Sequence, residues 1–98
     1  MTINTEKNNE TLTLKIEGRL DTTTAPVLEQ TIQEEADAVK DLILDMEKLN
    51  YISSAGLRVL LATQKKMNKI GTLRLINVCD AVMEVFEMTG FAGLLKFV

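Results

Sequence analysis

The chain begins with a segment in which apolar and polar residues alternate, which is the spacing of a strand with one buried side. Residues 11–17 follow this alternation and predict a half-buried strand. The dipeptide Asn8-Asn9 is typical of a turn, so residues 3–7 are expected to form the other arm of a hairpin. The apolar positions of the predicted strand are Leu12, Leu14 and Ile16.

A helical spacing replaces the alternation after a run of threonines. Thr23 or Thr24 can cap a helix, and Pro26 suits the first turn. Apolar residues then recur every three or four positions, which predicts a helix with one buried stripe. The stripe consists of Ala25, Leu28, Ile32, Ala36 and Val39.

The middle of the chain predicts a second strand and a second helix. Residues 41–46 have a continuous apolar centre, as in a central strand that is covered on both faces. The amphipathic run 57–67 predicts a helix that ends at Gly71. The residues expected to face inward are Leu57, Leu60, Leu61 and Gln64.

The remaining segments continue the alternation of strand and helix. Residues 72–78 predict a strand, and Asp80 is expected to cap a third helix that Gly90 ends. Residues 94–98 are expected to form a final short strand. The order β-β-α-β-α-β-α-β favours one α/β domain over residues 1–98, with a mixed sheet of four to five strands and about three helices packed against it.

Composition is ordinary for one small soluble globular domain, which we expect in the cytoplasm. The formal net charge is -3 and no basic cluster is present, which argues against nucleic acid as a partner. No apolar run approaches membrane-spanning length, and the N-terminal residues lack the pattern of a signal peptide. Cys79 is the only cysteine, so no internal disulfide forms, in keeping with a reducing compartment.

The residue types required for catalysis are largely missing. The chain has no histidine, and Lys65 and Lys66 lie about three helical turns beyond Ser54, too far to activate its hydroxyl. Neither a phosphate-binding loop nor a dinucleotide motif is present. We therefore expect no enzyme activity, catalytic residue, cofactor or metal site. The carboxylates Asp21, Asp41, Asp45 and Glu47 are interpreted as caps and solvated strand ends.

Two adjacent hydroxyls, Ser53 and Ser54, precede the second predicted helix. A serine at this place can cap the helix, and Gly56 is expected to leave the backbone of the first turn uncovered. The free N–H groups and the helix dipole would tolerate a phosphate there. The pattern alone is compatible with an ordinary serine cap and with a phosphorylation switch.

Three blocks of sequence resemble STAS domains, particularly the bacterial anti-sigma-factor antagonists. The first is Gly18-Arg19-Leu20-Asp21 with Ala25-Pro26, which is similar to the stretch before the first helix of the family. The second is the strand ending Asp45-Met46-Glu47 with the following residues 49–57, Leu-Asn-Tyr-Ile-Ser-Ser-Ala-Gly-Leu. The third, residues 86–91, is similar to the family's ending of the third helix.

The resemblance implies a phosphorylation switch at Ser54. The family motif usually reads Asp-Ser-[Ser/Thr]-Gly, and a partner anti-sigma kinase phosphorylates its first serine. In this chain that serine is Ser54, while Ser53 replaces the aspartate and Ala55 the third residue, so Ser53 becomes a second candidate acceptor. The unphosphorylated form would bind the anti-sigma factor and free a sigma factor, and a phosphatase would reverse the modification.

The same resemblance implies a partner-binding surface around the switch. Arg58 is interpreted either as a partner of the phosphate or of acidic groups, or as an ordinary exposed arginine. Tyr51 and Ile52 are interpreted as core residues. The expected partner-binding residues are Asp21, Thr22, Ser53, Ser54, Ala55, Gly56 and Arg58.

A second function remains compatible with the sequence. The chain would then be a constitutive STAS binding subunit, for example of an ABC-type lipid transporter, whose helix surface docks on an ATPase without any phosphate. The retained Ser54 and Asp21 favour the phosphorylation switch. Neither function requires insertion into a membrane.

Overall fold

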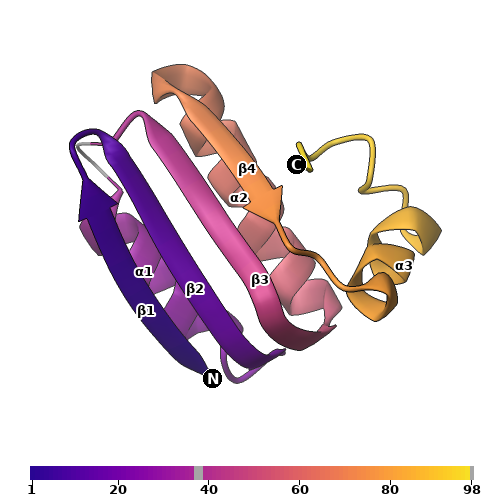
Figure 1. The fold of residues 1–98 in the computed structure, drawn as a ribbon. Coiled ribbons are helices and arrows are strands. Elements are labelled where there is room, and N and C mark those ends of the chain that lie inside the picture. The colour runs from indigo at the N-terminus through magenta and orange to yellow at the C-terminus, as the bar shows by residue number, and fades with distance from the viewer. Residues whose placement is uncertain (37–38, 98) are drawn as a thin grey trace.

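Four strands form one mixed sheet in the order β1-β2-β3-β4 in the computed structural model, which describes residues 1–36 and 39–97 (Figure 1). β1 and β2 are an antiparallel hairpin, while β2 pairs with β3 and β3 with β4 in parallel. The strands are β1 (Thr2–Asn8), β2 (Thr11–Leu20), β3 (Asp41–Ile52) and β4 (Thr72–Ile76). The helices are α1 (Ala25–Glu35), α2 (Ser54–Ile70) and α3 (Asp80–Met88).

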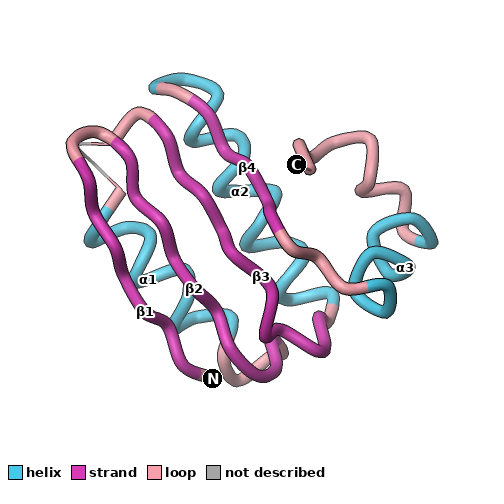
Figure 2. Tube along the Cα trace, viewed as in Figure 1, coloured by secondary structure: helices cyan, strands magenta, loops and turns pink. Residues whose placement is uncertain are grey.

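The two longer helices cover only one face of the sheet. α1 and α2 lie behind the strands, and α3 lies beyond the end of β4 (Figure 2). Alternate residues of β2 and β3 are buried towards the helices, and the residues between them are exposed or half-buried on the other face. The expectation that residues 41–46 are covered on both faces is therefore wrong. Their continuous apolar centre reflects one outward apolar side chain, the half-buried Ile43.

The pattern of buried positions confirms most of the predicted elements. Asn9 adopts φ 57° in the hairpin turn. All five residues of the predicted helical stripe are buried, but α1 ends at Glu35, so Ala36 and Val39 lie beyond the helix. In α2 the buried stripe is rotated, because Leu61 and Gln64 are only half-buried. None of the described helices has the length and apolar character needed to cross a membrane. The buried residues of α2 are Gly56, Leu57, Val59, Leu60, Thr63 and Met67.

β3 is longer than the sequence predicts and contains two register shifts. The pairing between β2 and β3 shifts between Lys15 and Glu17 and again between Gly18 and Arg19. Each shift places an additional exposed residue in β3 and breaks the alternation by which a strand is identified. The sequence pattern therefore hides that β3 continues to Ile52, and α2 begins almost directly after it.

The C-terminal part departs furthest from expectation. Cys79, not Asp80, occupies the N-cap position of α3, and Asp80 is the first residue of the helix. Gly90 has φ 79° just after α3, which confirms it as the stop. The predicted final strand is wrong over the described residues, because only Phe97 forms an isolated bridge, to Leu75. Val98 lies outside the described residues.

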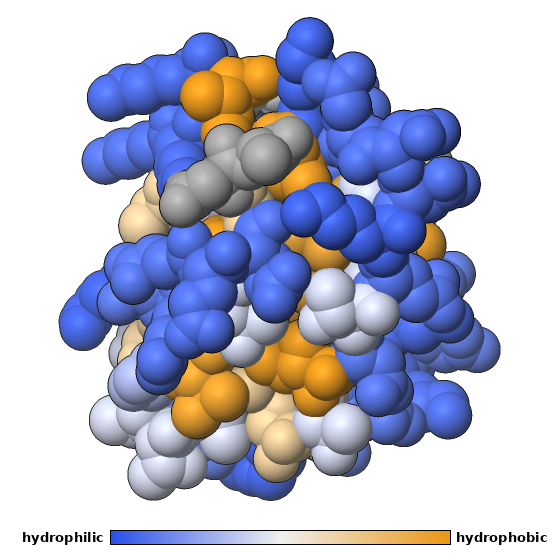
Figure 3. All heavy atoms as spheres, turned by 90° about the vertical axis from the view of Figure 1, so that its left-hand side faces the viewer, coloured by the Kyte–Doolittle hydropathy of each residue, from blue (hydrophilic) through white to orange (hydrophobic). Residues whose placement is uncertain are grey.

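β1 forms one edge of the sheet and is almost entirely exposed. Ile3 is its only partly buried residue. The side of the molecule on which β1 lies is largely polar, and its apolar atoms form separate small groups (Figure 3).

Gly56 allows α2 to approach the ends of β2 and β3 closely. The residue is buried, so the expectation that it leaves the backbone uncovered is wrong. A Cβ atom at this position would lie 2.7 Å from Cγ of Leu20 and 2.9 Å from Cγ1 of Ile52. A side chain is therefore excluded here by the packing of the strand ends against the first turn of α2.

We expect Gly56→Ala to lower the free energy of unfolding by about 1–3 kcal/mol, because overpacking displaces the helix start. Urea unfolding measures the loss. Gly93→Ala is the matched control, since a Cβ there meets no atom within 4 Å. Equal stability of the two variants would contradict the close approach.

Candidate functional site

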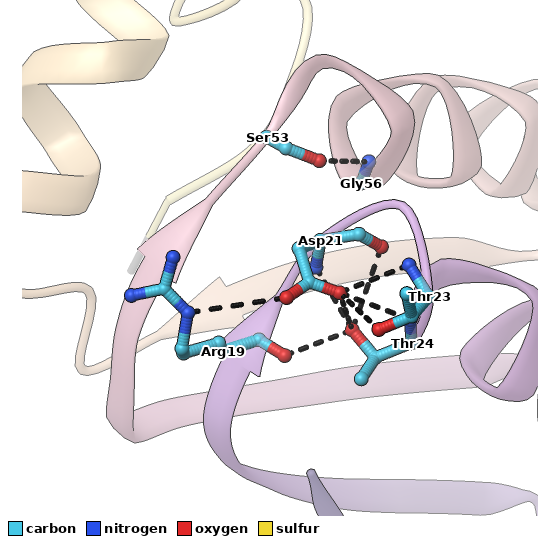
Figure 4. Close-up of polar contacts among 6 residues, drawn as sticks. All are labelled: Arg19, Asp21, Thr23, Thr24, Ser53 and Gly56. Carbon is cyan, nitrogen blue, oxygen red and sulfur yellow. Dashed lines mark hydrogen bonds and ion pairs between the residues drawn. The ribbon is translucent and has the colours of Figure 1, made fainter.

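Two loops meet where β2 and β3 end, and together they carry the predicted site residues. The carboxyl ends of adjacent parallel strands lie at the same edge of a sheet. Here the backbone N–H of Ser53 donates a hydrogen bond of 2.9 Å to the carbonyl of Leu20. The β2–α1 loop, which contains Asp21, therefore lies beside the start of α2 (Figure 4).

Ser53 is the residue that caps α2. Its backbone is extended, its carbonyl accepts the N–H of Leu57 at 3.0 Å, and its hydroxyl accepts the N–H of Gly56 at 3.5 Å. The half-buried Ser53 side chain thus serves the helix end.

Ser54 is the first residue of α2 and is exposed. Within residues 1–36 and 39–97, its hydroxyl has no hydrogen-bond partner. The first N–H groups of a helix have no intrahelical acceptor, and the helix dipole makes this end positive. A negatively charged group on the Ser54 oxygen would therefore be stabilised by these N–H groups and by the helix dipole.

Asp21 organises the neighbouring loop through several hydrogen bonds. Its Oδ1 accepts the N–H and the hydroxyl of Thr23 at 3.0 and 2.8 Å, and the N–H of Thr24 at 3.1 Å. These bonds, with the Thr23 hydroxyl as the strongest contributor, lower the pKa of the Asp21 carboxyl. Thr24 occupies the N-cap position of α1 without capping it, because its hydroxyl donates to the Arg19 carbonyl at 2.8 Å.

An open depression of about 230 Å³ lies between the first turns of α1 and α2. Ala55 is half-buried in it and Arg58 is exposed at its side. In the part of the chain that the structure describes, Arg58 forms no ion pair. Of the predicted partner-binding residues, Gly56 is buried beneath this surface. The lining residues are Thr22, Ala25, Pro26, Glu29, Ala55, Arg58 and Val59.

Tyr51 is a surface residue, so its interpretation as a core residue is wrong. Tyr51 is 40% exposed on the open face of the sheet, whereas Ile52 is buried as expected. The second register shift, at Asn50, turns Tyr51 outward. Arg19 lies over the ring, with its guanidinium carbon 4.1 Å from the centroid. Only the register of the two strands could have revealed this pair.

The other carboxylates lie apart from Asp21. Asp41 accepts the Thr72 hydroxyl at 2.6 Å, and Asp45 accepts the Asn77 side-chain amide at 3.0 Å. Asp41 is the first residue of β3, as expected of a strand end, but Asp45 and Glu47 lie within β3, so their interpretation as strand-end groups is wrong. In residues 1–36 and 39–97, no three or more metal-ligating side chains come together.

We expect Asp21→Ala to destabilise the protein at neutral pH and much less in acid. Because the folded-state pKa is lowered, the unfolded chain binds more protons, and the Asp21 contribution is complete above its unfolded pKa of about 3.9. It is lost as the pH falls through the folded-state value. Urea unfolding of both proteins between neutral and acidic pH measures this convergence.

Glu87→Ala serves as the control for that titration, since it removes an exposed carboxylate that lacks the threonine bonds. A change in the free energy of unfolding with pH that both variants share is an effect of net charge. A destabilisation of Asp21→Ala that stays constant down to the lowest pH would contradict the assigned role of the carboxylate.

Two relatives align with nearly the whole chain. BtrV of Bordetella bronchiseptica, named as a candidate anti-sigma factor antagonist, is 33% identical over 96 residues, which are 96% of this chain and 83% of BtrV. The anti-sigma-B factor antagonist of Staphylococcus aureus is 29% identical over 97% of this chain and 90% of its own length.

Solved structures agree with the fold. The anti-sigma factor antagonist SpoIIAA in its unphosphorylated form has a TM-score of 0.78 at 20% identity, covering 99% of this chain and 87% of that one. The Bacillus SpoIIAA in the phosphorylated form has a TM-score of 0.76 at 21% identity, covering 99% and 91%. The family model of the STAS domain matches residues 2–98. The chain therefore belongs to the STAS domain family.

Proposed function

We propose that this chain is an anti-sigma-factor antagonist that is switched by phosphorylation of Ser54. The observation that carries the proposal is the exposed hydroxyl of Ser54 at the start of α2, which has no hydrogen-bond partner among the described residues. The names of the BtrV and Staphylococcus relatives support the antagonist role. The unphosphorylated form would bind the anti-sigma factor and release its sigma factor.

A phosphate on Ser54 suits the fold but alters the surface. It adds about -1.5 to -2 charges at neutral pH, and the first turn of α2 stabilises it through N–H groups and the helix dipole. Arg58 follows one turn later on the same helix side, where it can pair with the phosphate. In an interface the phosphate must be desolvated or face acidic groups of the partner. A loss of about 3 kcal/mol weakens binding by roughly two orders of magnitude.

Ser54 is the better acceptor of the two serines. The Ser53 oxygen already accepts the N–H of Gly56, and its side chain is half-buried. Phosphorylation of Ser53 would therefore alter the cap itself, whereas Ser54 can be modified without breaking a described hydrogen bond.

In this proposal the partner proteins add and remove the phosphate. The anti-sigma factor would be a serine kinase that transfers the phosphate, and a separate phosphatase would remove it. The chain acts by binding and is not an enzyme in this proposal. All of these steps are proposed to take place in the cytoplasm.

We expect peptide mapping of the protein from its native cells to find phosphate on Ser54, with an occupancy that differs between growth and stress. Intact-mass analysis gives the total occupancy in the same samples. Phosphate on Ser53 instead would move the switch by one residue. Unmodified protein under every condition would contradict the switch and favour the constitutive STAS subunit.

Ser54→Asp is expected to abolish binding to the anti-sigma kinase, because the carboxylate carries negative charge into the interface. Ser53→Asp should weaken binding much less, since aspartate retains the capping oxygen. Calorimetric titration measures both, with Ser54→Ala as a variant that should bind. Normal binding by Ser54→Asp would show that the switch assignment is wrong.

A further inference from the structure

The open face of the sheet carries an exposed pair, Arg19 and Tyr51, that the phosphorylation switch does not use. The two residues are register partners on β2 and β3. The guanidinium carbon of Arg19 lies 4.1 Å from the ring centre of Tyr51. The Arg19 side chain is 61% exposed and Tyr51 is 40% exposed. The stacked pair, here called the Arg19–Tyr51 platform, is therefore accessible to a partner.

The platform is held in place before any partner binds. The Arg19 guanidinium contacts Asp21 as well as the ring of Tyr51. Nε of Arg19 lies 3.9 Å from Oδ2 of Asp21. The Arg19 carbonyl accepts the Thr24 hydroxyl at 2.8 Å, which fixes the backbone. A side chain that is already oriented loses less conformational freedom on binding than a mobile one.

The terminal nitrogens of Arg19 remain available. They point away from Asp21, which faces only the Nε side of the guanidinium (Figure 4). Apart from Asp21, no carboxylate among the described residues pairs with Arg19. Two parallel N–H donors match the two oxygens of a carboxylate. Tyrosine and arginine are also enriched among the residues that dominate binding energy in protein interfaces.

The platform is directly connected to the elements that position Ser54. Leu20, next to Arg19, accepts the N–H of Ser53, and a side chain at Gly56 would collide with both Leu20 and Ile52, the residue after Tyr51. The platform and the start of α2 are therefore held in place by the same two strand ends.

We propose that the Arg19–Tyr51 platform binds a carboxylate side chain of the same anti-sigma kinase that recognises Ser54. This inference rests on the proposed function and adds a contact on the opposite face of the sheet from α1 and α2. The platform adds binding energy to the complex with unphosphorylated protein. Phosphorylation of Ser54 then prevents the complex without acting on the platform.

The test measures the dissociation constant of the purified anti-sigma kinase that phosphorylates Ser54. Arg19→Ala and Tyr51→Ala are each expected to weaken binding about 30-fold, the effect of losing a dominant interface residue. Arg19→Lys should also weaken it, because the ammonium keeps the charge but lacks the planar pair of donors. Tyr51→Phe keeps the ring and should bind like the wild type.

Lys48→Ala is the matched control, because Lys48 is an exposed cation on the neighbouring strand β3 that forms an ion pair within the chain, with Glu17. It should bind like the wild type. Substituting the kinase's acidic residues one at a time should then find one carboxylate whose loss has no further effect in the Arg19→Ala background. That coupling is a property a merely structural arginine does not have.

The two proposals fail in different ways. If Arg19→Ala, Arg19→Lys and Tyr51→Ala bind normally while Ser54→Asp blocks binding, the platform is overturned and the switch stands. Circular dichroism melting confirms that each variant is folded, and Arg19→Lys decides the question if Arg19→Ala melts early. If the wild type binds no anti-sigma kinase, the proposed function and the platform are both overturned.

Discussion

The close contact between the first turn of α2 and the end of β2 is the constraint on which the site depends. The Ser53 N–H binds the Leu20 carbonyl, and Gly56 leaves no room for a side chain between α2 and Leu20. This contact joins two loops that are more than thirty residues apart in the chain. It also leaves Ser54 outside the junction, on the exposed side of the helix start.

The polar groups around this junction divide into a fixed set and a free set. Asp21, Thr23 and Thr24 satisfy one another within the β2–α1 loop. Ser54 and Arg58 make no such contacts in the described chain. Because the surface groups are separate from the bonded loop, the phosphate proposed on Ser54 could change the charge of the surface without disturbing the fold.

Local sequence patterns predicted the elements whose periodicity is regular. The hairpin, the serine cap of α2 and the first three positions of the α1 stripe follow from spacing and capping rules, and the structure has them. The outward turn of Tyr51 could not be predicted in this way. It depends on two register shifts between strands that are distant in sequence, and a bulge leaves no distinct local signal. The role of Gly56 likewise depends on which side chains face it.

β1 has a consequence for how the molecules behave in a crowded solution. Its outer edge presents backbone donors and acceptors that could pair with a strand of another copy. Its sequence opposes this, since Ile3 is the only apolar side chain among Thr2–Asn8, and Glu6 and Lys7 place charges along the edge. Glu6 is further engaged by Lys15 at 3.1 Å. The edge thus resists strand-to-strand aggregation between copies of the chain even when they are crowded together.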